Sequence, residues 1–297
     1  MSKKIKFIIN PISGIKHNRD RLKVIITNTI TSDEFVYHFQ QTNAPGDAFQ
    51  IAKKSLDQWF DIIVAVGGDG TVNEVASALV NTNVPLGIIP VGSGNGLARG
   101  LGIPLRIKQA TQTIVEGKVQ QIDVGKMQER YFFATAGAGF EAVVGKRFNE
   151  GIIRGPLPYI FWGFHEFLRY KPQEVVLKFD HQIIRKKALL VAIANTMQLG
   201  NGAIIAPQAK PDDGLLDVCI IDDINILQAL FNLPSLFTGL IENNPYTKFY
   251  RTSNLEIVRP QAAPIHVDGE TLDGDKILNV SLLPNALNVI TPGKYIK

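Results

Sequence analysis

The sequence predicts a two-domain chain, in which an α/β domain is followed by a β-rich domain that we expect to be a β-sandwich. Over about the first 120 residues, short apolar runs alternate with segments of helical spacing, a pattern typical of a parallel α/β layer. After Gln121, strand-like runs dominate, and Asp-Gly, Pro and Asn turns separate them. We therefore place the first domain at residues 1–121 and begin the second at residue 122.

The first domain is predicted to contain strands that alternate with helices. The strands are short apolar runs, and the helices show apolar residues at helical spacing. In a parallel sheet of this kind, ligands bind at the carboxyl ends of the strands. The predicted strands are 5–10, 34–39, 62–66 and 85–90, and the predicted helices are 19–29, 47–56, 72–80 and 107–116.

The second domain is predicted from seven strand-like runs and two helical segments. The helical segments are 156–170, which is rich in aromatic residues, and 224–241, which Pro234 should break. Helices of this composition usually face a core, and the alternative is that they admit an acyl chain or contact a membrane surface. The strand-like runs are 122–127, 130–140, 174–179, 188–195, 215–221, 254–259 and 277–283.

Composition limits the class of protein. The 297 residues are 45% hydrophobic and 20% charged, which suits a substantial core and excludes a disordered chain. Cys219 is the single cysteine, so no intrachain disulfide can form and a reducing cytosol is expected. No apolar run approaches the ~18 residues that span a bilayer, and the N-terminus reads as a strand rather than a signal peptide. There is no basic stripe with aromatic residues, so nucleic acid is not an expected partner.

The most informative stretch is the apolar run 62–66, which ends at Gly67-Gly68-Asp69-Gly70-Thr71 and continues as a helix. Glycines allow backbone N–H groups to approach an anion closely, and a helix N-terminus favours negative charge. A carboxylate within such a loop suits a phosphate that is bound together with a divalent cation. The other interpretation is a tight turn whose glycines only permit packing.

Three further polar loops follow predicted strands, so that four loops are expected at one edge of the sheet. Asn10–Gly14 follows the first strand, 41–47 the second, and 90–96 the fourth. Four such loops together predict a nucleotide-phosphate site more strongly than one Gly-rich loop does.

Together these motifs resemble the diacylglycerol kinase catalytic-domain family of lipid kinases, which includes sphingosine and ceramide kinases. The resemblance covers nearly the whole chain and depends on the order and spacing of motifs that are individually weak. The matching segments are 10–14, 42 with 46–48, 67–74, 90–99, 123–125, 137–140, 207–217 and 267–270.

The resemblance implies an N-terminal α/β domain similar to those of NAD kinase and phosphofructokinase, and a C-terminal β-sandwich domain, 122–285. The final segment, 286–297, should return to the first domain, and the nucleotide should lie in the interdomain cleft. Glycine N–H groups and hydroxyls can hold phosphate oxygens. By resemblance the ATP site comprises Asn10, Pro11, Ser13, Gly14, Thr42, Gly67, Gly68, Asp69, Gly70, Thr71, Asn73, Glu74, Ser93 and Asn95.

Phosphoryl transfer requires positioning, charge neutralisation and a base for the acceptor hydroxyl. Residues 266–275 supply two carboxylates, Asp268 and Glu270. If the chain is extended there, both point to one face; from the residues alone, Asp-Gly favours a hairpin turn. The resemblance implies Glu270 as base with Asp268 as its partner, although their roles could be exchanged. Asp69 is the expected Mg²⁺ ligand, and a second reading makes it the base.

The resemblance also implies a structural Mg²⁺ near the second acidic cluster. Asp213 would bind it through its carboxylate, and Lys210 and Leu215 through main-chain oxygens. From the residues alone, Asp-Gly in this cluster indicates a turn before a strand. The five histidines lack ligand-like spacing, so zinc is not expected.

The sequence departs from the bacterial diacylglycerol kinase pattern at two positions. That branch usually has Thr where this chain has Ser93, and an acid where this chain has Gly96 after Asn95. The GSGN segment is closer to sphingosine-kinase-like members. The departure removes a carboxylate from the expected polar network. It also weakens the prediction that diacylglycerol is the substrate.

We therefore expect a cytoplasmic, peripherally membrane-associated lipid kinase that uses ATP and Mg²⁺. It would transfer the γ-phosphoryl group to the hydroxyl of diacylglycerol or a sphingoid long-chain base, in lipid metabolism such as phospholipid biosynthesis. The alternatives are an NAD kinase-like enzyme and a non-catalytic lipid-binding or regulatory protein with a kinase fold. The expected partners are a lipid substrate and a membrane surface, and a homodimer is left open.

Overall fold

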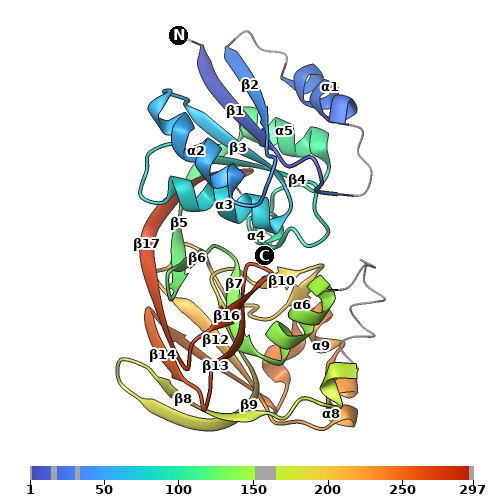
Figure 1. Ribbon diagram of the computed structural model, residues 1–297, viewed down its shortest axis with the longest axis vertical. Helices are drawn as coiled ribbons and strands as arrows, with labels where there is room; N and C mark the ends of the chain where they lie inside the picture. Colours follow the sequence, from blue (N-terminus) through green and yellow to red (C-terminus); the bar gives the residue numbers. More distant parts are fainter. Residues whose placement is uncertain (1, 15–18, 31–33, 151–164, 294–297) are drawn as a thin grey trace. The chain divides into compact units, whose positions relative to one another are not determined.

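The computed structural model describes residues 2–14, 19–30, 34–150 and 165–293 (Figure 1). The chain divides into two compact units, of which the first comprises residues 1–124 with 284–297 and the second comprises 125–283. The sequence analysis places the corresponding limits after residues 121 and 285. The architecture confirms the predicted fold class, an α/β domain and a β-sandwich domain.

The first unit is built on a parallel sheet with the order β2-β1-β3-β4. Its strands are β1 (Lys3–Ile9), β2 (Phe35–Gln41), β3 (Ile62–Gly67) and β4 (Leu86–Pro90). Every residue of β3 is buried, whereas edge strand β2 has no buried residue. These burial patterns follow from position, because a central strand is covered on both faces. Val289 near the end of β17 (Ile277–Thr291) pairs in parallel with Leu86.

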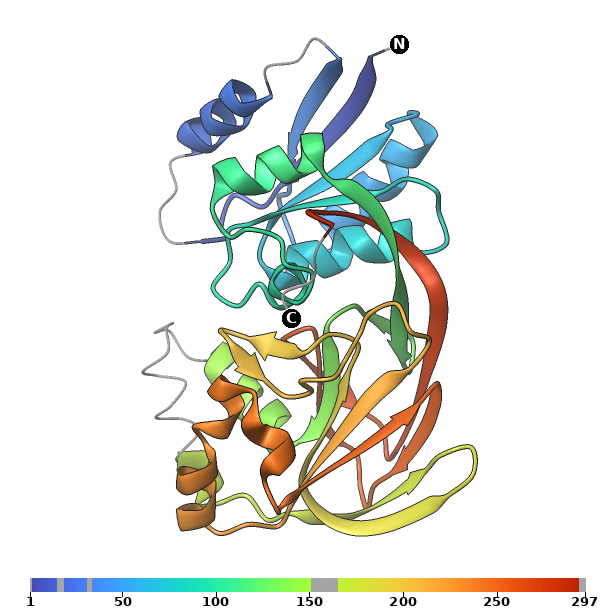
Figure 2. The same ribbon diagram turned by 180° about the vertical axis from the view of Figure 1, so that it is seen from behind.

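Helices cover both faces of this sheet. Figure 1 shows α2 (Asp47–Asp57) beside α3 (Asp69–Leu79) on one face, and Figure 2 shows α1 (Arg19–Thr29) beside α5 (Ile107–Glu116) on the other. A short helix, α4 (Gly96–Gly100), lies between β4 and α5 in the sequence. Two boundaries, 19–29 and 107–116, agree with the prediction. α3 begins at Asp69 rather than at residue 72, because the backbone becomes helical directly after Gly68, whose φ and ψ are extended.

The second unit is an antiparallel sandwich. Strand order is β16-β15-β7-β9-β8-β14-β17, and β12 pairs with both β9 and β13. The first half of β9 pairs with β8, whereas its second half pairs with β7 and β12, so the sheet folds over at β9. The strands are β5 (Lys118–Met127), β6 (Arg130–Phe132), β7 (Thr135–Gly139), β8 (Gln173–Lys178), β9 (Ile183–Ala194), β10 (Gln198–Gly200), β11 (Ala203–Ile204), β12 (Leu216–Asp222), β13 (Thr247–Thr252), β14 (Asn254–Val258), β15 (Ala263–Val267), β16 (Glu270–Gly274) and β17.

Alternating side chains of β12 enter two different cores. Val218 and Ile220 pack in the sandwich core, whereas Cys219 and Ile221 pack in a second apolar cluster on the opposite face. This explains why β12 reads as a continuous apolar run in the sequence. Cys219 is a fully buried free thiol, and burial raises its pKa above the ordinary value.

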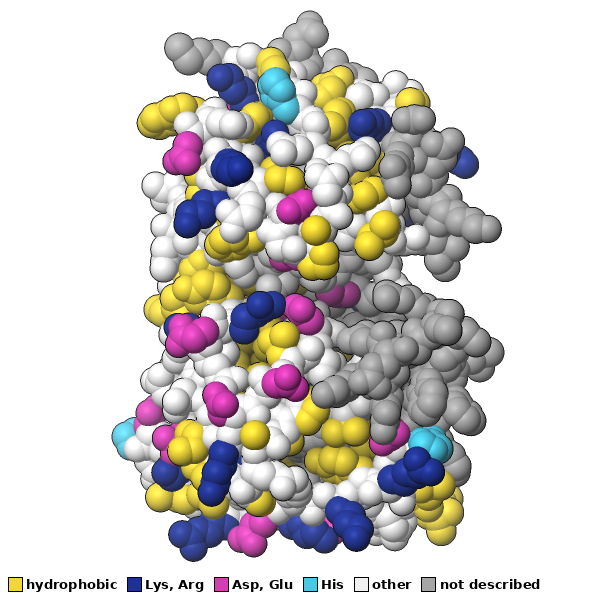
Figure 3. Space-filling view, in the orientation of Figure 1, with side chains coloured by type: hydrophobic (Ala, Val, Ile, Leu, Met, Phe, Trp, Pro, Cys, Tyr) yellow, Lys and Arg dark blue, Asp and Glu magenta, His cyan; other side chains and the backbone are white. Residues whose placement is uncertain are grey.

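The helices of the second unit pack on this second cluster. They are α6 (Phe140–Glu150), α8 (Ile226–Asn232) and α9 (Ser235–Thr238), followed by the 3₁₀ turn η1 (Leu240–Asn243). Pro234 separates α8 from α9, as predicted, and Asn225 caps α8 through a capping box with Gln228. In Figure 3, hydrophobic and basic side chains gather at the lower right, where Figure 1 shows α8.

Two predictions for the second unit need correction or restriction. Helix α6 was not expected; the strand-like run 130–140 ends at Gly139, whose φ of 123° breaks the strand before the helix begins. Most of the predicted helix 156–170 lies outside the described residues, of which 165–167 are helical.

Candidate active site

The carboxyl end of β3 meets the carboxyl end of β4 through backbone alone. The Val91 N–H donates to the Gly67 carbonyl oxygen at 3.0 Å. A Cβ on Gly92 would lie 2.6 Å from the Gly68 Cα, and a Cβ on Gly67 would lie 2.4 Å from the Thr71 Cβ. A side chain at Gly92 would therefore push the two loops apart, and one at Gly67 would collide with the Thr71 side chain after the same strand. The glycines permit this close packing, which is the alternative interpretation given in the sequence analysis; their approach to an anion stays a prediction.

Asp69, the first residue of α3, joins these loops through its carboxylate. One oxygen, Oδ2, accepts the Asn95 N–H at 2.8 Å, and Oδ1 accepts the Gly96 N–H at 2.6 Å. A Cβ on Gly94 would lie 2.6 Å from Oδ2. Gly96, at the position where the resemblance leads us to expect an acid, thus contributes a main-chain donor to Asp69 and no second carboxylate.

The electrostatic setting of Asp69 favours a cation. Burial raises the pKa of Asp69, while the N–H groups of Gly96 and Asn95, its own N–H and the charge of Arg99 act in the opposite direction. The result is a carboxylate in a partly desolvated environment that accepts hydrogen bonds from main-chain N–H groups. A divalent cation would complete this environment, because carboxylate oxygens are the ligands that Mg²⁺ prefers.

The loop of Asn95 is held rigidly by its own side chain. Asn95 Oδ1 accepts the Gly92 N–H at 3.1 Å, and Nδ2 donates to the Gly92 carbonyl at 2.7 Å. Asn95 has a φ of 53°, a left-handed conformation that asparagine tolerates better than most residues. Arg99 donates from Nε to the Gly94 carbonyl at 3.0 Å. Ser93, predicted to bind the nucleotide, is exposed at the tip of this loop.

The loop after β1 is fastened to both others. Asn10 donates from Nδ2 to Thr71 Oγ1 at 2.9 Å. Gly14 has a φ of 85°, and a Cβ there would lie 2.4 Å from the Val91 carbonyl oxygen. Pro11 and Ser13 lie between these two anchors and are half-buried. Three loops that are distant in sequence therefore form one backbone-lined surface at the carboxyl edge of the sheet.

The loop after β2 is attached through Glu74. Its carboxylate accepts the Gly46 N–H at 2.9 Å and the Ala48 N–H at 3.0 Å. This places Glu74 as a support for the N-terminus of α2. Thr42 is buried at the end of β2, and Asn73 is buried on α3. Gly70, in the first turn of α3, is exposed.

A hollow adjoins the loop that follows β4. Its volume is about 230 Å³, and polar Ser93, Asn95 and Arg99 share its lining with apolar side chains such as Leu105 and Ile107. The hollow lies wholly within the first unit, next to the backbone surface described above. The first unit therefore supplies both a set of backbone donors and a partly apolar recess, the two features that a nucleotide requires.

In the second unit, Asp268 anchors the β15–β16 hairpin. Asp268 and Gly269 have φ of 45° and 82°, so they form a tight turn, and Asp268 is a turn residue rather than part of an extended strand. The Asp268 carboxylate accepts the N–H groups of Phe133, Ala134 and Thr135 at 2.9, 2.8 and 3.1 Å. The extended geometry that would place both predicted carboxylates on one face is therefore wrong, and the turn interpretation is correct.

Glu270 differs from Asp268 in exposure and in partner. Its side chain is 52% exposed, and Oε2 accepts a hydrogen bond from Arg130 Nη2 at 2.9 Å. An ion pair so open to water contributes little to stability. Glu270 therefore contributes little to the stability of the fold, whereas the Asp268 carboxylate accepts hydrogen bonds from three main-chain N–H groups.

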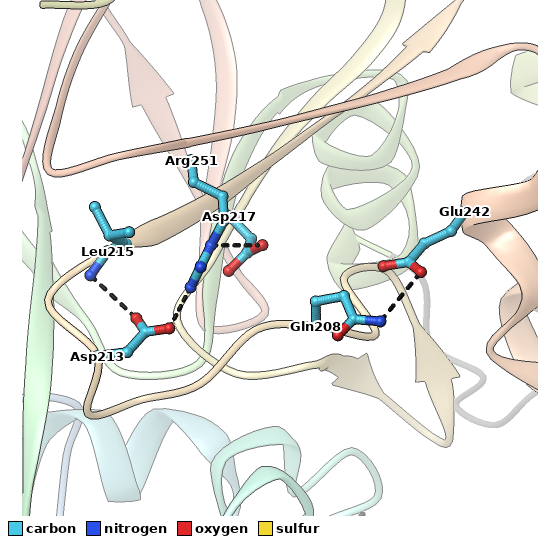
Figure 4. Close-up of polar contacts among 6 residues, drawn as sticks. All are labelled: Gln208, Asp213, Leu215, Asp217, Glu242 and Arg251. Carbon is cyan, nitrogen blue, oxygen red and sulfur yellow. Dashed lines mark hydrogen bonds and ion pairs between the residues drawn. The ribbon is translucent and has the colours of Figure 1, made fainter.

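The predicted structural-metal residues lie in the loop before β12 (Figure 4). Asp213 accepts the Leu215 N–H on Oδ1 at 3.2 Å and is paired with Arg251 on Oδ2. Arg251 also lies near the Asp217 carboxylate, with Nε 3.5 Å from Oδ1. Among the described residues no group of three or more His, Cys, Asp or Glu side chains is arranged for a metal. A cation at Asp213 would depend on main-chain oxygens, as predicted for Lys210 and Leu215, and would share the carboxylate with Arg251.

Asp217, in β12 directly after this loop, should make the free energy of unfolding depend on pH. Burial raises the pKa of Asp217 from 3.8 to about 6, against the attraction of Arg251. Between these pH values the Asp217 carboxyl is ionised in the unfolded chain and protonated in the folded protein. The free energy of unfolding therefore falls as pH rises, by about 3 kcal/mol in total. Asp217→Asn should remove this fall between pH 4 and 7 in urea titrations. Exposed Asp180→Asn is the control, and an unchanged pH profile in Asp217→Asn would contradict the assignment.

Comparison with known proteins decides the family. A sequence model described as "Diacylglycerol kinase catalytic domain" matches residues 4–127, and one described as "YegS C-terminal NAD kinase beta sandwich-like domain" matches 134–291, more than half of the chain. The chain belongs to the diacylglycerol kinase catalytic-domain family. It is accordingly an enzyme of the lipid kinase class, a phosphotransferase.

Individual relatives agree with this family. The protein is 29% identical to a "Diacylglycerol kinase" of Staphylococcus saprophyticus, with 98% of this chain and 96% of the relative covered. It is 30% identical to a "Probable lipid kinase YegS-like" of Chromohalobacter salexigens, with 83% and 81% covered. The crystal structure of a diacylglycerol kinase from Bacillus anthracis has the same fold, with a TM-score of 0.74, 21% identity, and 99% and 98% covered.

Membership in the diacylglycerol kinase family leaves the individual site roles as predictions. The predicted ATP-site residues of the first unit gather around β1, β3 and β4, and the backbone of their loops is interlocked. The interdomain position of the nucleotide also stays a prediction. Within the described residues no helix is long and apolar enough to cross a membrane.

The sequence analysis missed a buried polar pair beside the hairpin that carries Asp268 and Glu270. His266 Nδ1 lies 3.2 Å from Glu141 Oε1, and the side chains are 9% and 11% exposed. Thr271 pairs with His266 across the hairpin. The pair joins the first turn of α6 to β15. The signal was within reach, because the family motif quoted from the sequence ends one residue before Glu141.

Proposed function

We propose that the protein is an ATP- and Mg²⁺-dependent lipid kinase that transfers the γ-phosphoryl group of ATP to a lipid hydroxyl. One observation carries this proposal: Asp69 sits at a helix N-terminus among three interlocked Gly-rich loops. Backbone donors at a helix N-terminus favour phosphate oxygens, and a carboxylate among them favours a bridging cation. A nucleotide triphosphate with Mg²⁺ satisfies both requirements.

In the proposed reaction, the acceptor oxygen forms a bond to the γ-phosphorus while the bond from that phosphorus to the β,γ-bridging oxygen breaks, and ADP leaves. Glu270 is proposed to take the proton of the acceptor hydroxyl on its carboxylate, since it is half-exposed and its ion pair among the described residues is with Arg130. Asp69 would hold Mg²⁺, which supplies charge neutralisation for the transferring phosphoryl group. The backbone of residues 10–14, 67–71 and 91–96 would orient the phosphates.

A second, structural Mg²⁺ is proposed at the Asp213 loop. The donors that the sequence analysis assigns there are oxygens, a ligand type that suits Mg²⁺. Arg251 occupies one carboxylate oxygen of Asp213, so the cation would compete with, or displace, this guanidinium. This site would stabilise the loop and would take no part in proton transfer.

Diacylglycerol is the first proposed acceptor, because relatives over nearly the whole chain carry the name diacylglycerol kinase. A sphingoid long-chain base is the second, because Gly96 lacks the carboxylate that is usual in bacterial diacylglycerol kinases and the segment reads GSGN. Both acceptors reside in membranes, so the enzyme is proposed to act in the cytoplasm at a membrane surface, in lipid metabolism such as phospholipid biosynthesis.

Transfer of radiolabelled phosphate from ATP to a mixed lipid pool, followed by mass spectrometry of the product, tests activity and substrate together. We expect a phosphorylated diacylglycerol or long-chain base, and no product when Mg²⁺ is chelated. Phosphorylation of NAD instead would support an NAD kinase-like enzyme. Lipid binding without any transfer would support a regulatory protein, and either result would overturn the proposal.

A further inference from the structure

The helices α8, α9 and η1 present an unusual apolar surface. Phe231 is 85% exposed and Leu227 is 65% exposed, and four neighbours are between 45% and 56% exposed. Together with these two residues, the surface, called here the α8–α9 surface, comprises Leu230, Leu233, Phe237 and Leu240. Single exposed apolar residues are common, but a contiguous cluster of this kind marks an interaction site.

The opposite side of these helices is already satisfied. Ala229 and Leu236 pack on the apolar cluster that contains Cys219 and Ile221. No residue of α8 or α9 is fully buried. The exposed leucines and phenylalanines therefore lie on the outer face of these helices. Other side chains of α8 and α9 make the contacts with the core.

The segment that forms the α8–α9 surface carries no charge of its own that would repel an anionic partner. Residues 224–241 carry no charged side chain. The acids just before them, Asp222 and Asp223, are ion-paired with Lys186 and Lys187. Glu242, just after them, accepts a hydrogen bond from Gln208. The two aspartates are thus paired with lysines, whereas Glu242 keeps its negative charge and is hydrogen-bonded to a neutral amide.

Residues 165–171 lie close to this surface in the fold and carry two exposed basic side chains. The helical residues 165–167 lie beside α8 in both views (Figures 1 and 2), and Phe167 packs on the same apolar cluster as Ala229. Leu168 is 63% exposed, and Arg169 and Lys171 are exposed. An apolar area with a basic rim is complementary to the surface of an anionic bilayer.

We propose that the α8–α9 surface docks the protein on an anionic lipid bilayer, with its leucine and phenylalanine side chains at the boundary between headgroups and acyl chains. This inference deepens the proposed function, on which it rests, by naming the surface through which the enzyme meets its membrane. Short helices with large apolar side chains on their outer face lie in the plane of the interface rather than across it. Arg169 and Lys171 would face the anionic headgroups.

Vesicle sedimentation of the full chain tests the proposal without ATP or a lipid acceptor. Vesicles contain phosphatidylcholine alone or with phosphatidylglycerol. We expect binding to the anionic vesicles, and a loss of at least ~10-fold in affinity for the double variant Leu227→Gln/Phe231→Gln, because two large apolar side chains no longer leave water. Ile183→Gln, which alters an equally exposed side chain on β9, should bind as wild type does.

Two further measurements separate this inference from the proposed function. Activity toward a short-chain, water-soluble diacylglycerol without vesicles should be the same in the double variant and the wild type. Vesicle binding that depends on Leu227 and Phe231 in a protein without kinase activity would support the docking surface and overturn the proposed function. Kinase activity with vesicle binding unchanged in the double variant would overturn the docking surface. A wild-type dimer that the double variant converts to monomer would assign the surface to a second copy and would also overturn it.

Discussion

Asp69→Asn should lower kcat at least ~100-fold while the protein stays folded. The substitution keeps the shape of the side chain and an oxygen that accepts a hydrogen bond, so the loop of Asn95 and Gly96 retains one anchor. It removes the negative charge that a divalent cation requires. Since burial disfavours the charged form of Asp69, the neutral variant should not lose much stability. Steady-state kinetics and thermal melting measure the two effects.

The design of this test separates metal binding from folding. Asp57→Asn, at the exposed end of α2, removes the same charge from the same unit away from the loops and should leave kcat unchanged. A Mg²⁺ titration of wild type should show saturation of ATP binding, and Asp69→Asn should require much more Mg²⁺. Wild-type turnover in Asp69→Asn would exclude Asp69 both as ligand and as base.

Glu270→Gln is expected to lower kcat by at least ~100-fold with little change in KM for ATP. Glutamine preserves the volume and the hydrogen bond to Arg130 but cannot take a proton. Because the Glu270 side chain is half-exposed and its ion pair is weak, the melting temperature should stay close to that of wild type. Steady-state kinetics with ATP as the varied substrate, together with thermal melting, measure the two effects.

Asp268 and Arg130 provide the contrast for Glu270. Asp268→Asn should lower the melting temperature, because the main-chain donors of residues 133–135 lose a charged acceptor. Arg130→Gln should leave both stability and chemistry nearly intact, since it removes only a surface ion pair. If Asp268→Asn abolished turnover without any loss of stability while Glu270→Gln remained active, the base would be Asp268 and not Glu270.

Local signals explain what could be predicted of the fold. The helices 19–29 and 107–116 were predicted with the observed limits because apolar spacing within each segment defines them. Many strands of both units were visible as apolar runs, although β12 serves two cores at once. The sequence analysis did not predict β10, β11, β13, β15 and β16. α6 was missed because its first turn is held by Glu141, which pairs with a histidine 125 positions further along the chain. Propensity within a window carries no information on such a contact.

The same division between local and distant contacts applies to the site. The glycine-containing loops 67–71 and 90–96 were recognisable in the sequence, but the approach of Gly92 to the Gly68 backbone is seen only in the structure. The roles of the carboxylates were harder to separate. Asp268 and Glu270 are two residues apart in the sequence, yet one collects main-chain donors and the other meets Arg130, 140 residues away. Only the assembled sheet distinguishes an anchoring acid from one that remains chemically available.

The anchoring of the β15–β16 turn has a consequence for the timing of catalysis. The Asp268 carboxylate accepts hydrogen bonds from the main-chain N–H groups of residues 133–135, at the start of β7. The shape of the turn is therefore fixed by the fold of the sandwich. Glu270, the proposed proton acceptor, directly follows this turn and would need no rearrangement of its own backbone in each catalytic cycle. The free energy needed to position this carboxylate is spent when the protein folds, so that the site is already organised before each reaction.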